Sequence, residues 1–95
     1  MANINLSLQI IPVVPEEQVY DVVDKVIAYI AQTGVKYEVG AMETTMEGEL
    51  SQLLEVVKKA QDICVEEGAS RVLSVVKIDY KPQGVTMDEK IYQYR

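Results

Sequence analysis

The order in which two hydrophobic spacings follow one another limits the folds open to this chain. Over residues 3–12, hydrophobic and polar residues alternate, as in a strand with one buried face. Over residues 15–33 and 50–67, hydrophobic residues recur every three or four positions, as in an amphipathic helix. Further strand patterns cover residues 36–41, 44–49 and 70–80. The predicted order is therefore β-α-β-β-α-β.

This order is that of the ferredoxin-like, split βαβ arrangement of the α+β class. It predicts a four-stranded antiparallel sheet with two helices on one face. Gly34 and Gly68 stand where the two helices should end. Thr86 and Glu89 have the spacing of a capping box, which predicts a short C-terminal helix. At 95 residues, we expect one domain over 1–95.

Charge and composition argue against several classes of function. The net charge of −6 disfavours nonspecific nucleic-acid binding and suits a cationic or neutral ligand. Histidine, the most frequent general base, is absent from the sequence. The lone cysteine, Cys64, excludes an internal disulfide and predicts the cytoplasm as the compartment. The sequence shows no apolar run of membrane-spanning length and no secretory signal pattern.

Enzymes and other binding proteins of this topology need residues that are missing here. Hydrolysis of acyl phosphates needs a phosphate-cradling loop with an arginine, whereas Pro12–Pro15 contains neither arginine nor glycine. A heavy-metal chaperone would need a Cys-x-x-Cys pair. An RNA-binding domain would stack bases on aromatic residues of the open sheet face, and the first strand offers none. We therefore expect no catalytic residues, no metal site and no cofactor.

The sheet face that the helices leave open is the most informative predicted surface. It must meet water, a ligand or another subunit. On the first strand it carries Asn5, Ser7, Gln9 and Ile11. On the last strand it carries Arg71, Leu73, Val75, Lys77 and Asp79. This mixture of polar and hydrophobic residues predicts an interface or a ligand groove, and we expect a homodimer or homotetramer through it. A lightly apolar surface in water is the alternative.

A set of short motifs resembles those of a known family. The motifs are Ser7–Pro12, Lys36–Gly40, Thr44–Glu49, Lys77–Tyr80 and Asp88–Tyr94. Together they resemble the small thiamine-binding proteins, ferredoxin-like domains related to the YkoF-type binders of thiamine and hydroxymethylpyrimidine. The resemblance covers nearly the whole chain. It implies a cytoplasmic oligomer that binds thiamine or its pyrimidine precursor without catalysis.

Such a ligand gives the polar residues of the motifs specific roles. The predicted ligand-binding residues are Ser7, Gln9, Tyr37, Thr45, Glu47 and Glu49. Hydroxyl and amide groups would contact ring nitrogens, and Tyr37 would stack on the ring. Alternation places Glu47 and Glu49 on one face, where a carboxylate would accept from the amino group or offset a thiazolium charge.

Simpler roles for these residues stay open. Ser7 and Gln9 would also suit a strand face in water, and Tyr37 would suit packing between subunits. Glu49 would also suit the first turn of the second helix. The alternative function is a metabolite-sensing or structural oligomer that acts through a protein partner and has no thiamine site.

Overall fold

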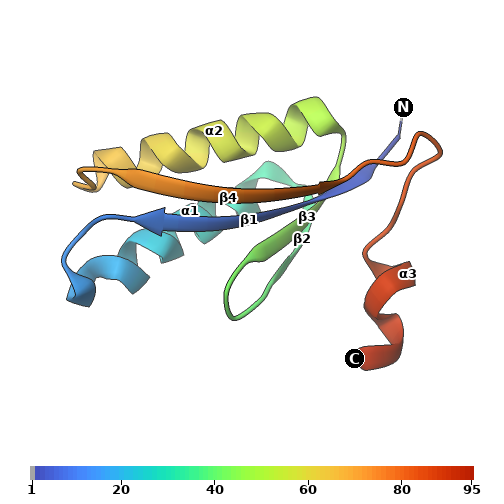
Figure 1. The fold of residues 1–95 in the computed structure, drawn as a ribbon, viewed down its shortest axis with the longest axis horizontal. Coiled ribbons are helices and arrows are strands. Elements are labelled where there is room, and N and C mark those ends of the chain that lie inside the picture. The colour runs from blue at the N-terminus through green and yellow to red at the C-terminus, as the bar shows by residue number, and fades with distance from the viewer. Residues whose placement is uncertain (1) are drawn as a thin grey trace.

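The computed structural model describes residues 2–95, which form a sheet with helices α1 and α2 on one face (Figure 1). The strands are β1 (Ile4–Pro12), β2 (Lys36–Val39), β3 (Thr44–Gly48) and β4 (Val72–Asp79). The helices are α1 (Val19–Thr33), α2 (Leu50–Glu66) and α3 (Asp88–Ile91), with single 3-10 turns at Glu16–Gln18 and Tyr92–Tyr94. The strand order is β2-β3-β1-β4, and each neighbouring pair is antiparallel. The predicted ferredoxin-like α+β fold is confirmed.

The hydrophobic core lies between the sheet and the two long helices. Ile4, Leu6 and Leu8 on β1 are at most 3% exposed and pack with buried residues of α1 and α2. Gly48 ends β3 beneath α2, and a methyl group there would lie 3.3 Å from the Leu53 side chain. This glycine therefore lets α2 pack closely on the sheet. No helix within residues 2–95 is long and apolar enough to cross a membrane.

The C-terminal segment returns to the sheet face that α1 and α2 leave open. Gly84 has a left-handed backbone conformation, with φ of 95°, at the turn that leads into the segment. The next residue, Val85, donates its N–H to the Asn3 carbonyl oxygen over 3.0 Å. Val85 and Met87 are buried, which fixes the start of the segment against the sheet.

The predicted capping box forms at the beginning of this segment. The Thr86 N–H donates to the Glu89 carboxylate over 2.6 Å, and the Glu89 N–H donates to the Thr86 hydroxyl over 3.1 Å. The helix that follows is short, since α3 spans four residues before the chain tightens into a 3-10 turn.

Candidate functional site

Two rows of paired residues cross the open face of the sheet. The first row is Lys36, Glu47, Asn5 and Asp79. The second row is Glu38, Thr45, Ser7 and Lys77. Paired residues share a face, so these polar side chains stand together opposite the hydrophobic core.

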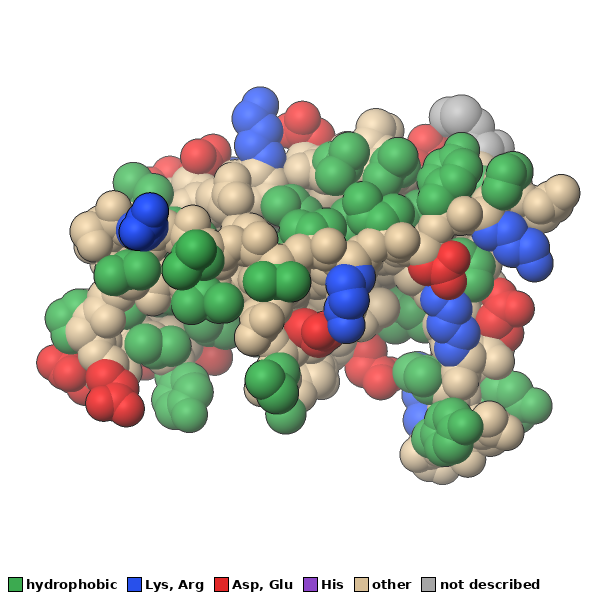
Figure 2. Space-filling view, in the orientation of Figure 1, with side chains coloured by type: hydrophobic (Ala, Val, Ile, Leu, Met, Phe, Trp, Pro, Cys, Tyr) green, Lys and Arg blue, Asp and Glu red, His purple; other side chains and the backbone are tan. Residues whose placement is uncertain are grey.

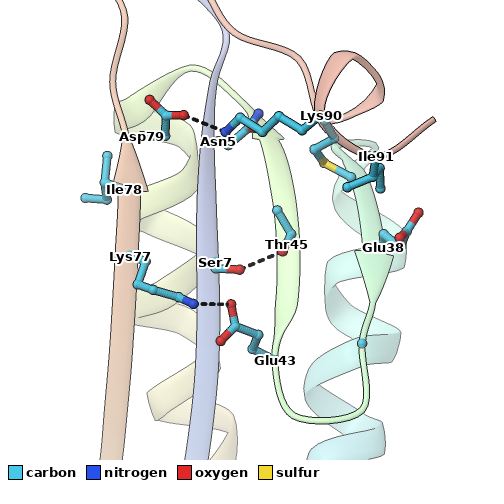
Figure 3. A pocket seen from close by; sticks show the side chains of 12 residues that line it. Asn5, Ser7, Glu38, Glu43, Thr45, Lys77, Ile78, Asp79, Lys90 and Ile91 are labelled. Carbon is cyan, nitrogen blue, oxygen red and sulfur yellow. Dashed lines mark hydrogen bonds and ion pairs between the residues drawn. The ribbon is translucent and has the colours of Figure 1, made fainter. Parts of the chain in front are cut away.

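A cavity of about 420 Å³ lies over these rows, between the β2–β3 hairpin and the C-terminal segment (Figure 3). Its floor includes Asn5, Ser7 and Thr45, and the hairpin contributes Glu43. The C-terminal segment contributes Met87, Lys90 and Ile91. This volume lies within the range of about 300–1,000 Å³ typical of small-molecule sites.

Two polar contacts lie on the cavity floor. The Lys77 ammonium lies 3.0 Å from the Glu43 carboxylate, and the Ser7 and Thr45 hydroxyl oxygens lie 2.6 Å apart (Figure 3). The Ser7 hydroxyl, and then Lys77, hold the pKa of the Glu43 carboxyl below its usual range. One contact therefore joins β4 to the tip of the β2–β3 hairpin, and the other joins β1 to β3.

Asn5 has an unsatisfied acceptor at the base of the cavity. Its side chain is 4% exposed, and its amide nitrogen donates to the Val85 carbonyl oxygen over 3.2 Å. The amide oxygen, Oδ1, is buried without a hydrogen-bond partner among residues 2–95. An unpaired buried polar atom costs about 1–3 kcal/mol of stability. Such atoms are rare in folded proteins, and a functional role is one explanation for them.

The C-terminal segment is held over the site by one backbone contact and several ion pairs. The Met87 N–H donates to the Glu47 carboxylate over 2.7 Å. Lys90 pairs with Asp79 at 2.5 Å, and Arg95 pairs with both Glu38 and Asp88 at 2.7 Å. Asp88 also pairs with Lys36. These ion pairs are exposed, and such pairs contribute little each, about 0–1 kcal/mol.

Of the predicted site residues, the structure brings Ser7 and Thr45 together in the cavity. Gln9 follows on the same face of β1, paired with Val75, and lies outside the cavity lining. Tyr37 pairs with the buried Met46, so it stands on the side of the sheet that faces the helices.

The two predicted carboxylates separate, because β3 ends at Gly48 and alternation does not continue to Glu49. Glu47 lies on the open face and holds the Met87 N–H. Glu49 caps α2 from an extended conformation, and its carbonyl oxygen accepts from the Leu53 N–H over 3.0 Å. The structure thus gives both residues positions outside the cavity lining.

Sequence reasoning missed several residues of the site. Asn5 precedes Ser7 by two residues, so the same alternation places it on the open face. Glu43 lies between two of the predicted strands and pairs with Lys77, while Asp79 pairs with Lys90. Across residues 2–95, no cluster of His, Cys, Asp and Glu is arranged to hold a metal ion.

The fold and the site together define a class of protein, a ferredoxin-like domain with a small-molecule cavity on its open sheet face. Comparison with known families identifies which one. The profile of the family described as "Thiamine-binding protein" matches residues 6–95. The chain belongs to this thiamine-binding protein family, as its motifs suggested.

Individual relatives support the assignment along the full chain. A UPF0045 protein of Clostridium perfringens is 65% identical over 95 residues, which is 100% of each chain. A domain of unknown function, DUF77, from Bacillus cereus superposes with a TM-score of 0.92 at 52% identity, covering 99% of this chain and 91% of that one. A protein of Thermotoga maritima, provisionally assigned to thiamine biosynthesis or salvage, gives a TM-score of 0.89 at 35% identity, with 98% and 99% covered.

Proposed function

We propose that this protein binds thiamine or a related aminopyrimidine such as hydroxymethylpyrimidine, reversibly and without catalysis. The observation that carries the proposal is the cavity of about 420 Å³ on the open sheet face, with the Ser7–Thr45 hydroxyl pair in its floor. Membership in the thiamine-binding family supplies the ligand class.

The chemistry of the lining suits such a ligand. Glu38, Glu43 and Asp79 supply carboxylates that can accept from amino groups or offset a thiazolium charge. Met87 and Ile91 line the cavity from the C-terminal segment and offer apolar cover for a ring. The proposed site therefore combines acceptors from the sheet with apolar contacts from the segment.

A matched pair of variants tests this site. Thr45→Val removes a hydroxyl that lines the cavity, whereas Thr44→Val makes the same change in a buried neighbour on the opposite face. Isothermal titration with thiamine, thiamine phosphate and hydroxymethylpyrimidine should show saturable binding by the parent protein. We expect Thr45→Val to weaken it roughly 2- to 12-fold, the loss of one hydrogen bond, and Thr44→Val to leave it unchanged. Folded protein that gives no heat with any of the three ligands would contradict the proposal.

We also propose that the chain forms a homo-oligomer through the open face, in the cytoplasm. Beyond the cavity this face carries Ile11, Leu73 and Val75, which are 38%, 50% and 49% exposed. Hydrophobic side chains gather along the β4 side of the molecule in Figure 2. A second copy that covered these residues would lie next to the cavity.

Neighbouring residues of β4 provide a test of the oligomer. Val75→Glu places a charge on the open face, and Val76→Glu places it on the opposite face of the same strand. In sedimentation equilibrium at micromolar concentration, we expect an oligomer for the parent and for Val76→Glu, and a monomer for Val75→Glu. A monomeric parent would refute this part of the proposal. An oligomer that binds none of the three ligands would favour the second candidate, a protein that acts through a partner by way of this patch.

A further inference from the structure

We infer that Asn5 selects ligands with an amino group, because its Oδ1 atom is an acceptor that only an N–H or O–H donor can satisfy. The inference rests on the proposed function and names the part of the ligand that the site recognises. It predicts discrimination against a pyrimidine that carries an oxo group where thiamine carries its amino group.

The hydrogen bond to Val85 fixes the orientation of the Asn5 amide. A carbonyl oxygen accepts and cannot donate, so the Val85 oxygen requires the NH₂ end of the amide. The reversed amide would place two acceptors against each other. Oδ1 is thereby held in a buried position with no partner within residues 2–95, on a residue that lines the cavity.

The residues paired with Asn5 across the sheet do not donate a hydrogen bond to Oδ1. Asn5 lies on central strand β1 between Glu47 and Asp79, and carboxylates are acceptors as well. Glu47 accepts from the Met87 N–H, and Asp79 accepts from the Lys90 ammonium. Neither carboxylate can donate to Oδ1, so a ligand N–H would supply the missing donor.

The hydroxyl pair on the same face of the sheet offers further acceptors. The Ser7 and Thr45 hydroxyl oxygens lie 2.6 Å apart, and either hydroxyl can donate the hydrogen bond between them. Whichever hydroxyl donates, each oxygen has lone pairs that can accept from a ligand, as Asn5 Oδ1 can.

The unpaired Asn5 Oδ1 atom favours a ligand edge that carries a donor. The exocyclic amino group of an aminopyrimidine supplies two N–H donors at one atom, and Oδ1 can accept one of them. An oxo group at the same ring position would set an acceptor against Oδ1 and leave Oδ1 unsatisfied. Sites that hydrogen-bond a substrate group reject analogues lacking it strongly, because their own polar atoms are left unpaired.

Titration with thiamine and oxythiamine, its analogue with an oxo group in place of the amino group, tests the inference. We expect the parent protein to prefer thiamine by at least about tenfold. Asn5→Leu keeps the size of the side chain and removes Oδ1, so it should lower thiamine affinity and reduce the preference to within about twofold. Asn3→Leu, the same change at an exposed residue near the start of the strand, should keep the preference of the parent.

The possible outcomes separate this inference from the proposed function. Equal binding of the two compounds by the parent would overturn the role of Asn5 and leave thiamine binding intact. Binding of neither would overturn both. If Asn5→Leu does not fold, the side-chain amide resonances of Asn5 in the parent decide the matter. They should shift on addition of thiamine, and no shift at saturation would overturn the inference.

Discussion

Alternate residues of β1 are almost equally buried and chemically opposite. Ile4 and Leu6 are 0% exposed and face the helices, while Asn5 and Ser7 are 4% and 9% exposed and face the other way. Burial of the hydrophobic residues stabilises the fold by roughly 1.5–3 kcal/mol each. Burial of the polar residues costs free energy unless every polar atom is paired. One face of the strand thus accounts for stability, and the other has the features of a site.

The two faces also differ in how they are covered. Helices of 15 and 17 residues cover the hydrophobic face. The polar face is covered by a segment whose helix has four residues, and exposed ion pairs and the Glu47–Met87 contact hold it. We infer a permanent cover on one face and a cover of low local stability on the other.

The largest expected effect is a difference in the free energy of unfolding between variants on the two faces of β1. Leu6→Ala should lower the free energy of unfolding by about 2–5 kcal/mol, because it leaves a cavity in the core. Ser7→Ala, one residue along, loses one hydrogen bond and should cost only about 0.5–1.5 kcal/mol. Urea denaturation of both variants measures the difference. A cost for Ser7→Ala as large as that for Leu6→Ala would make the polar face a structural one.

A second variant pair tests how the C-terminal segment is held. Glu47→Ala removes the acceptor of the Met87 N–H, a bond to a charged group worth about 1.5–3 kcal/mol. Amide exchange over residues 86–94 should become roughly 10- to 150-fold faster, while exchange at Leu53 in the core stays slow. Glu49→Ala is the control and should leave exchange in the segment unchanged. Faster exchange in both regions of Glu47→Ala would contradict a locally held segment.

The capping box should have a smaller effect of the same kind. Thr86→Ala removes the side-chain partner of the Glu89 N–H, and loss of such a cap costs about 0.5–2 kcal/mol. We expect faster amide exchange over residues 88–91 with an unchanged urea midpoint for the core. A shift of the whole unfolding transition would show that the two covers are coupled.

Acid should destabilise the C-terminal segment that covers the polar face before it affects the helices that cover the hydrophobic face. Contacts first with Lys36 and then with Arg95 lower the pKa of Asp88 from its ordinary value of 3.8. The Thr86 N–H lowers the pKa of Glu89 from 4.5. These carboxylates stabilise the segment above their ordinary pKa values, and the contribution is lost as the pH falls through the lowered ones. Resonances of Tyr92 and Tyr94, followed from pH 7 downward, should change below about pH 4 before those of the core. Simultaneous change would contradict this order.

Much of the hydrophobic face could be predicted from sequence, because its residues repeat at the spacings of strands and helices. The same alternation placed Asn5 and Ser7 on the open face, but it does not show that the Asn5 side chain is buried there. It failed at Glu49, since nothing in the local pattern shows that β3 ends one residue earlier. Tyr37 lies on the side of the sheet that faces the helices, because register, rather than residue type, decides which face a strand residue occupies.

The position of the C-terminal segment over the cavity could not be predicted in the same way. The Thr86–Glu89 spacing located the start of the final helix, and that much is confirmed. Where the helix docks depends on contacts with residues about 40 positions or more away, such as Glu47 and Lys36. Charged residues on a short helix carry no periodic signal for such partners, so the contribution of Lys90 to the site became visible only in the structure.

The most direct test of the account is a titration of ¹⁵N-labelled protein with thiamine, followed by amide chemical shifts. If the polar face holds the ligand, saturable shifts should concentrate at Asn5, Ser7, Thr45, Lys77 and Met87. Amides of α1, on the far side of the sheet, should move little. Shifts that gather along α1 and α2, or no saturable shifts in folded protein, would contradict the claim that the open face is a thiamine site.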